Sequence, residues 1–453
     1  MLKLFLWLRY LRKKKIVFLS IAAVALSVSL LIVVASLFTG FIKTFEKAAV
    51  ETVGDVVISP WKYEEPTTFA KYPLLIEQLE KTESVEAATP MISGYGLLHL
   101  GRGNVRAVEV WGIEPEGREK VTGFAKFLRK QGKVTEEPSF KVPDSPDQIG
   151  GFVGIGVLDE PDEQTDEYDY DVAEKMLGRS VVLTTGTVTG QDNEDGTRPE
   201  FKRQVAKFAI ADIIETGIYE FDSGCVYLPI EKLSKILYPD VESPVTSQIL
   251  IKLADNTDAD VALAVIRGVW RTFVQEQLDA DPDLMTSTHI NTARQLQSRL
   301  IAAYEKQMGI LLLIFGVISL GVVLLVFCIF CMIVRLKQKD IAIIKSCGAT
   351  SSAVAFVFVG FGACVGAVGS GIGAVLGYVI TRNINTIEDW IRIIFGLKLW
   401  KSSVYLFSEI PNEVNWSWAL RIVLMAIIAA AIGTLIPAII AARTKPVNIL
   451  RYE

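Results

Sequence analysis

The chain has 453 residues, of which 51% are hydrophobic, and its formal net charge at pH 7 is −5. So large an apolar share is unusual for a soluble protein of this length, and the balance of charge leaves no basic domain for binding nucleic acid. Among the five cysteines only Cys225 lies in the large polar part of the chain, which excludes an exterior domain held by its own disulfides.

Four apolar stretches without a charge in their middle predict transmembrane helices. They are residues 16–41, 309–334, 353–380 and 420–442. Each exceeds the roughly 20 residues that an α-helix needs to cross a bilayer. We therefore predict a helical membrane protein with one helix before, and three helices after, a large polar segment, residues 42–308.

Positive charge predicts the orientation of these helices. Lysines and arginines gather in residues 1–15, in the short loop 335–352 and in the tail 443–453. Because cytoplasmic loops are enriched in these residues, all three are predicted to be cytoplasmic, and residues 42–308 and 381–419 to lie outside. Residues 1–15 are also amphipathic, so they either lie along the cytoplasmic membrane surface or form a simple basic anchor.

The polar segment has the patterns of a mixed α and β domain. Strands are predicted at residues 53–59, 105–113 and 248–253, and helices at residues 69–81 and 258–274. The apolar face of the last helix is predicted to consist of Val261, Ala264, Val265, Val269 and Phe273. A strand–helix–strand unit near each end of the segment indicates one α+β domain of two separated halves, with a second lobe inserted between them.

Two features of the inserted lobe stand out. Residues 180–189 and 202–214 are rich in β-formers on either side of a polar turn with an Asp-Gly step, which predicts a hairpin. Residues 159–171 form an acidic run. We interpret this acidic run as a solvated loop, with weak binding of a divalent cation as the alternative.

The third apolar stretch is rich in glycine. Gly362 and Gly366, Gly369 and Gly373, and Gly373 and Gly377 are each four residues apart, so they share one side of a helix. In lipid, small residues at this spacing allow two helices to approach closely. The stripe therefore predicts tight packing against another helix, within the protomer or between protomers.

Signatures of catalysis and of cofactor binding are missing. The chain lacks a Walker phosphate loop, a zincin motif and a nucleophile elbow, and its two histidines have no metal-ligand pattern around them. The apolar stretches also lack the mid-membrane charges that ion-coupled transporters keep. We therefore predict no enzyme, no cofactor and no metal on this chain, and expect the energy for any work to come from a partner that acts from the cytoplasm.

The loop and the C-terminus carry patterns of a known family. The string K-D-I-A-I-I-K-S-C-G-A-T (339–350) closely resembles the cytoplasmic loop of FtsX-like ABC permeases, R-E-I-A-I-L-K-x-L-G-A-S. The ending P-A-I-I-A-A-R-T-K-P-V-N-I-L-R-Y-E (437–453) resembles the ending of that family, with Asn448 where a Glu is usual. Residues 208–233, which begin F-A-I-A-D-I-I-E-T-G-I-Y-E-F-D, are similar to its lipoprotein-releasing branch.

The resemblance implies a permease subunit of an ABC transporter in the bacterial inner membrane. Its expected partners are a cytoplasmic ATPase that binds the ATP, a second permease subunit, a lipoprotein substrate, a periplasmic lipoprotein carrier and membrane lipids. Such a transporter extracts lipoproteins from the outer leaflet of the inner membrane and hands them to the carrier. Two alternatives stay open: a mechanotransmitting regulator of a periplasmic hydrolase, as in the cell-division branch, and an exporter of a peptide or amphiphile.

The resemblance also implies three sets of site residues. Coupling to the ATPase is expected from the loop residues Lys339, Asp340, Ile341, Ala342, Ile343, Ile344 and Lys345, unless the loop merely caps the preceding helix. An acyl-chain pocket is expected at the outer ends of the first two helices, from Val34, Leu37, Phe38, Phe41, Ile42, Tyr304, Met308, Leu311 and Leu312. The alternative for this set is ordinary packing or lipid contact. A hook for the carrier is expected at Arg198, Pro199, Arg203 and Gln204.

Overall fold

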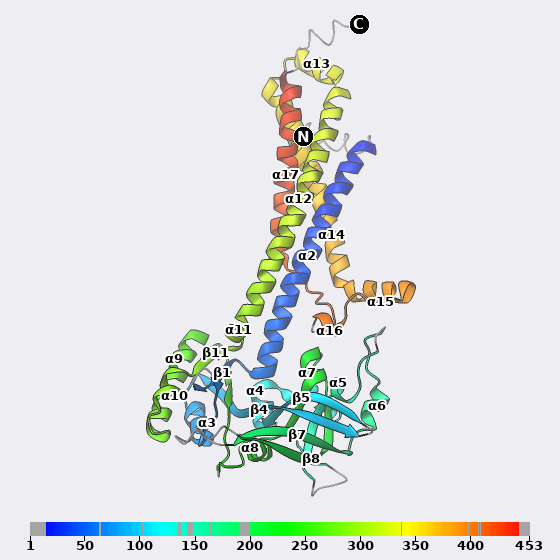
Figure 1. Ribbon diagram of the computed structural model, residues 1–453. Coiled ribbons are helices and arrows are strands. Elements are labelled where there is room, and N and C mark those ends of the chain that lie inside the picture. Colours follow the sequence, from blue (N-terminus) through cyan, green and yellow to red (C-terminus); the bar gives the residue numbers. More distant parts are fainter. Residues whose placement is uncertain are drawn as a thin grey trace. The chain divides into compact units, whose positions relative to one another are not determined.

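The computed structural model (Figure 1) describes residues 15–62, 65–101, 103–134, 137–142, 148–162, 165–189, 200–241, 243–336, 338–396, 398–405, 407 and 409–443. Contacts divide the chain into two compact units. We call Met1–Thr44, Leu300–Trp390 and Ile410–Glu453 the helical unit, and Phe45–Arg299 with Ile391–Glu409 the sheet unit. Apart from Lys15 and Arg443, the predicted amphipathic segment 1–15 and the tail 443–453 lie outside the described residues.

One group of helices lies outside the sheet or, like α2, leads into it. In chain order they are α2 (Lys15–Val53), α12 (Ser298–Leu336), α13 (Gln338–Ser346), α14 (Ser351–Arg382), α15 (Ile384–Phe395), α16 (Ser402–Tyr405) and α17 (Trp416–Arg443). Within the described part of the chain, four of them, α2, α12, α14 and α17, are long and apolar enough to cross a membrane. The structure thus combines four candidate transmembrane helices with an α+β unit.

Both α2 and α12 extend past the apolar stretches that predicted them. α2 continues beyond residue 41 to Val53, and α12 begins at Ser298. Hydropathy marks the part of a helix that suits lipid, whereas the helix itself ends where its backbone hydrogen bonding ends. α2 stops at Gly54, whose φ of 79° is left-handed and whose N–H donates to Val50 O at 2.8 Å.

The glycine stripe of α14 packs against helices of the same chain. Gly373 and Gly377 face α2, and a Cβ added to Gly373 would lie 2.5 Å from Ala25 O. Gly362 faces α17, where an added Cβ would clash with Thr434. The prediction of close helix packing is confirmed, and the contacts lie within one protomer.

Among the described residues, the sheet unit contains a nine-stranded sheet and a separate pair, β2 (Trp61–Lys62) and β3 (Glu65–Pro66). The nine strands are β1 (Val56–Ser59), β4 (Val85–Gly101), β5 (Asn104–Ile113), β6 (Gly150–Gly154), β7 (Ser180–Thr189), β8 (Glu200–Ile214), β9 (Cys225–Pro229), β10 (Gln248–Leu253) and β11 (His289–Thr292). Their order is β11-β1-β10-β4-β5-β9-β6-β8-β7, and β4 also pairs with β7. The strands from β4 round to β7 therefore close on themselves, while β10, β1 and β11 continue the sheet beyond β4.

The long strand β4 belongs to both parts of this sheet. Its first half, from Val85 to Met91, pairs with β10, and its second half pairs with β5 on one edge and with β7 on the other. The inserted part of the unit is thus built onto the same sheet. β1, from the start of the unit, lies between β10 and β11, from its end.

The predicted hairpin is confirmed by the antiparallel pairing of β7 with β8, from Ser180 opposite Ala209 to Thr189 opposite Glu200. Its turn, residues 190–199, lies outside the described residues. The hairpin contributes Val181, Leu183 and Phe208 to a core enclosed by the closed strands. This core is where the apolar side chains of β5, β6 and β9 also gather.

Further helices belong to the sheet unit. They are α3 (Tyr72–Glu80), α4 (Pro115–Thr122), α5 (Ile155–Leu158), α6 (Tyr170–Glu174), α7 (Tyr219–Gly224), α8 (Ile230–Leu237), α9 (Ala259–Gln277), α10 (Pro282–Thr286) and α11 (Ala293–Leu296). α3 and α9 pack on β1 and β10 and form a second core with Leu75, Ile266 and Trp270. Asp258 caps α9, since its side chain accepts hydrogen bonds from the N–H groups of Asp260 and Val261.

The predicted buried face of α9 is wrong for most of its residues. Val261 and Val265 are exposed, whereas Ile266, Trp270 and Phe273 are buried. The helix has apolar residues on two sides, and the side with the larger aromatic rings is the one turned inward. Aromatic rings bury more apolar surface than valines, so that orientation is favoured.

Candidate functional site

The loop with the family pattern forms α13, and one side of this helix is buried. Ile341 and Ala342 are buried, and Ile341 packs with Val334, Val354 and Ala441 from α12, α14 and α17. Lys345 Nζ donates to Ala442 O at 2.7 Å, near the end of α17. α13 is thereby packed against three of the candidate transmembrane helices.

The opposite side of α13 is open. Ile343 is 53% exposed, and Lys339 is exposed beside it. The side chains of Asp340 and Ile344 lie outside the described residues. Of the residues predicted to couple to an ATPase, Ile341 and Ala342 therefore serve the contact with the neighbouring helices, while Lys339 and Ile343 face outward, where a partner can reach them.

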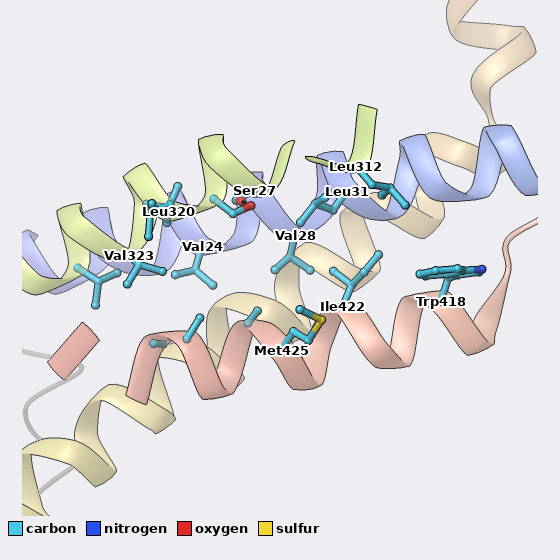
Figure 2. Close-up of a pocket in the computed structure, with 17 residues that line it drawn as sticks. Val24, Ser27, Val28, Leu31, Leu312, Leu320, Val323, Trp418, Ile422 and Met425 are labelled. Carbon is cyan, nitrogen blue, oxygen red and sulfur yellow. Dashed lines mark hydrogen bonds between the residues drawn. The ribbon is translucent and has the colours of Figure 1, made fainter. Parts of the chain in front are cut away.

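An apolar groove of about 450 Å³ lies between α2, α12 and α17 (Figure 2). Its walls are formed by Val24, Ser27, Val28, Leu31, Leu312, Gly316, Ser319, Leu320, Val322, Val323, Val326, Trp418, Ile422, Met425, Ala426, Ala429 and Ala430. The hydroxyls of Ser27 and Ser319 are hydrogen-bonded to each other at 2.9 Å. In this wall one serine hydroxyl donates to the other, which lowers the cost of placing an apolar ligand beside them.

The residues predicted for an acyl-chain pocket lie mostly beyond one end of this groove. Leu312 is shared with the groove wall. Phe41 and Tyr304 meet edge to face, with ring centroids 4.8 Å apart, and join α2 to α12. Phe41 and Met308 are buried, and the others are half-buried on the same two helices: Val34, Leu37, Phe38, Ile42 and Leu311.

Sequence reasoning missed the wall that α17 supplies. Figure 2 shows Ile422 and Met425 of α17 across the groove from Val24 and Val28 of α2. The signal that could have found this wall is the spacing of Ala426, Ala429 and Ala430. Alanines three and four positions apart share one side of a transmembrane helix and leave room there for a ligand or a neighbour.

The residues predicted for a carrier hook are only partly described. Arg198 and Pro199 lie outside the described residues. Arg203 and Gln204 lie on β8, opposite Gly186 and Thr185 of β7. Arg203 is exposed and Gln204 is half-buried. Both are therefore held in the paired part of the hairpin.

The acidic run 159–171 holds the segment 391–409 within the sheet unit. Lys398 Nζ lies 3.6 Å from Asp166 Oδ2 and donates to Thr165 O at 3.0 Å. Ser402 N donates to Asp166 Oδ2 at 2.8 Å, and Arg392 Nη1 lies 3.1 Å from Glu167 Oε1. The interpretation of this run as a solvated loop is therefore wrong around Asp166, because sequence alone could not show that basic residues more than two hundred positions later would meet it.

A buried carboxylate lies close to this contact. Asp222 accepts hydrogen bonds from Thr216 N at 2.7 Å, Thr216 Oγ1 at 2.8 Å and Gly217 N at 2.9 Å. Burial nevertheless raises the pKa of Asp222 to about 7, because the ionised form loses its water. Ile218, which follows Gly217, forms a β-bridge with Phe407. Phe407 lies in the segment 391–409 that the acidic run holds.

A buried cation holds the end of α2 to the sheet. Arg118 is fully buried, its Nη2 donates to Thr52 O in the last turn of α2, and its guanidinium lies 5.5 Å from the centroid of the Trp111 ring. A cation at a helix C-terminus satisfies unpaired carbonyl groups and complements the helix dipole. Burial lowers the pKa of Arg118 to about 10.

Comparison with known proteins finds two family models that match parts of the chain. Residues 312–446 match the FtsX-like permease C-terminal family, and residues 17–149 match the MacB-like periplasmic core domain. The chain is similar over its whole length to the lipoprotein-releasing system transmembrane protein LolC of Neisseria meningitidis serogroup B, with 26% identity over 100% of this chain and 99% of that protein. The chain is similar to FtsX-like permeases over residues 312–446, and to a permease of the lipoprotein-releasing system over its whole length. The resemblance read from the loop and the C-terminus is confirmed.

Other members of the lipoprotein-releasing branch match at a similar level. LolC of Xylella fastidiosa strain 9a5c is 27% identical over 98% of this chain and 98% of its own length. LolE of Haemophilus influenzae is 25% identical over 95% of this chain and 93% of its own length. The FtsX-like match contains α13 and α14 and ends three residues past α17. It therefore includes the α12 and α17 walls of the groove, whereas the α2 wall lies outside it.

Proposed function

We propose that this chain is the permease subunit of an ABC transporter that extracts lipoproteins from the outer leaflet of the inner membrane and hands them to a periplasmic carrier. The observation that carries the proposal is the full-length similarity to permeases named for lipoprotein release, which extends through both the helices and the α+β unit. The apolar groove supports it, since an acyl chain needs a site without unsatisfied polar groups.

The proposal includes the topology expected from charge. α2 would cross the membrane first, the α+β unit would follow on the periplasmic side, and α12, α14 and α17 would complete a one-plus-three arrangement. Both termini and α13 would be cytoplasmic. The ATP would be bound by a separate cytoplasmic ATPase, with no cofactor on this chain. A second permease subunit, identical or related, would complete the transporter.

α13 is the element that would receive the power stroke. An ATPase would bind the outward side of α13 at Lys339 and Ile343. Its movement would displace α13, whose inward side is packed on α12, α14 and α17. Since α12 and α17 both line the groove, that movement would change its width. The residues predicted for the acyl-chain pocket lie between Val34 and Ile42 on α2 and between Tyr304 and Leu312 on α12. They would extend the groove toward the periplasmic end of these two helices.

ATPase activity tests the proposal. The chain is purified with its cytoplasmic partner in lipid nanodiscs and is given a triacylated lipoprotein or the same protein without its acyl chains. We expect stimulation by the acylated form alone. Equal responses to both forms would contradict lipoprotein extraction and favour the mechanotransmitting regulator, which would then be tested by searching for a periplasmic hydrolase bound to the sheet unit.

A pair of variants asks whether the groove is the acyl site. Ala426→Phe fills the groove wall, whereas Ile428→Phe adds the same ring at an exposed position on α17. We expect Ala426→Phe to abolish stimulation by the acylated lipoprotein and Ile428→Phe to leave it intact. Equal stimulation of both variants would show that the acyl chain binds outside this groove. The transport proposal itself would still stand.

A further inference from the structure

α15 has an apolar side that stands exposed. Trp390, Ile393 and Ile394 are each between 65% and 76% exposed. With 3.6 residues per turn, Ile387, Trp390 and Ile394 share one side of the helix. The polar residues Asn385, Glu388 and Arg392 project to the other side.

The polar side of α15 is the one held by protein. Asn385 Nδ2 donates to Ile410 O at 3.2 Å, and Ile410 N donates to Asn385 Oδ1 at 3.0 Å. Arg392 Nη1 lies 3.1 Å from Glu167 Oε1. An amphipathic helix on a soluble protein turns its apolar side inward, so α15 has the reverse arrangement and needs an apolar medium outside.

The start of α15 lies at the end of two candidate transmembrane helices. α14 ends at Arg382, and α15 begins at Ile384. Tyr378 in the last turns of α14 stacks on Trp416, the first residue of α17, with ring centroids 5.6 Å apart. Both helices therefore reach the membrane surface at this level, and the medium that surrounds the first turn of α15 there is the interface of the bilayer.

We propose that α15 is an interfacial helix that lies in the bilayer surface, with Trp390, Ile393 and Ile394 among the lipids. Tryptophan favours this interface, and a helix with one apolar and one polar side is stable along it. Three residues after the end of α15, Lys398 forms an ion pair with Asp166 of the acidic run. The proposal depends on the helices crossing a membrane and is independent of what is transported; only the side of the membrane rests on the proposed topology.

Spin labelling tests this contact in the whole chain, bound to its ATPase in lipid nanodiscs. The cysteines at 328, 331, 347 and 364 are replaced by serine or alanine, and Cys225 stays because it is buried. A nitroxide is then placed at Ile394→Cys, at Ile428→Cys on the exposed side of α17, or at Lys235→Cys on the exposed side of α8. Collision of each label is measured with oxygen, which concentrates in lipid, and with a water-soluble nickel chelate.

We expect the oxygen-to-nickel ratio at position 394 to be close to that at position 428 and several-fold above that at position 235. A ratio at 394 equal to that at 235 would place α15 in water and overturn the proposal. Shielding from both reagents would overturn it as well, since the apolar side would then be covered by protein, such as a second permease subunit. A labelled Asp389→Cys variant on the polar side controls for helix geometry and should give a lower ratio than position 394.

Discussion

Lys398 Nζ lies 3.6 Å from Asp166 Oδ2, and the two side chains are only 12% and 7% exposed. Asp166 is held in a left-handed conformation, with φ of 55°, which a residue other than glycine adopts only where its surroundings require it. The pair joins the acidic run to the segment between α15 and α17.

Loss of one partner of this pair should release the segment 391–409. Lys398→Met leaves the Asp166 carboxylate buried without its cation, which costs about 3–5 kcal/mol. Arg392→Ala is the matched control, since its partner Glu167 is 67% exposed and such a pair contributes less than about 1 kcal/mol. Hydrogen exchange of the full chain in nanodiscs should show faster exchange in peptides of 391–409 for Lys398→Met alone. Equal protection in both variants would contradict this role.

The glycine stripe of α14 should tolerate a methyl group only where space exists. Gly373→Ala forces a Cβ to within 2.5 Å of Ala25 O, so α2 and α14 must separate, at a cost of about 1–3 kcal/mol. Gly371→Ala, two residues away, meets no atom within 4 Å. Thermal unfolding in nanodiscs should show a lower midpoint for Gly373→Ala and no loss for Gly371→Ala. Identical midpoints would mean that α2 and α14 are not packed as described.

The two sides of α13 should respond differently to a charge. Ile343→Asp alters the exposed side and should weaken association with the ATPase while the permease stays folded. Ile341→Asp places a charge in the cluster with Val334, Val354 and Ala441 and should lower the stability of the permease itself. Co-purification with the ATPase and unfolding of the permease alone separate these effects. Normal assembly of Ile343→Asp would show that the outward side of α13 is not the coupling surface.

The stability of the sheet unit should depend on Asp222 as pH changes. Because burial raises the pKa of Asp222 to about 7 from the ordinary 3.8, the folded state binds this proton more tightly than the unfolded state. The stabilisation is complete at the acid end and is lost as pH rises through about 7. The neighbouring Glu215 strengthens the effect, and the donors Thr216 and Gly217 oppose it.

Asp222→Asn tests this dependence, because asparagine accepts the bond from Thr216 N without ionising. Between about pH 4 and pH 7 the wild-type chain should lose stability relative to the variant. Denaturant unfolding of the full chain across that range, followed by hydrogen exchange of peptides around residue 222, gives the difference. A constant difference over the whole range would show that Asp222 stays ionised in the folded protein.

Some features of this protein could be read from the sequence because local properties decide them. The four candidate transmembrane helices depend on apolar runs, the β7–β8 hairpin depends on β-formers on either side of a turn, and the cap of α9 depends on Asp258. The family pattern of the loop drew attention to the residues that form α13, whose coupling to an ATPase stays a prediction. Each of these is set by residues that are neighbours in the chain.

Other features were decided only when distant segments packed. Glycine spacing predicted close packing of α14, but only the tertiary structure showed α2 on one part of the stripe and α17 on another. Hydrophobicity could not tell that Ile341 is buried while Ile343 is exposed, since both are equally apolar and only the positions of α12, α14 and α17 distinguish them.

The groove and the ion pair have the same cause. The groove exists because α2, α12 and α17 leave a gap between their apolar side chains, and Asp166 is buried because Lys398 reaches it from a remote segment. Local sequence determined much of the secondary structure and which helices are apolar enough to cross a membrane. The choice of partner for each face required the whole fold, because free energy of burial depends on which distant surface covers a side chain and not on the side chain alone.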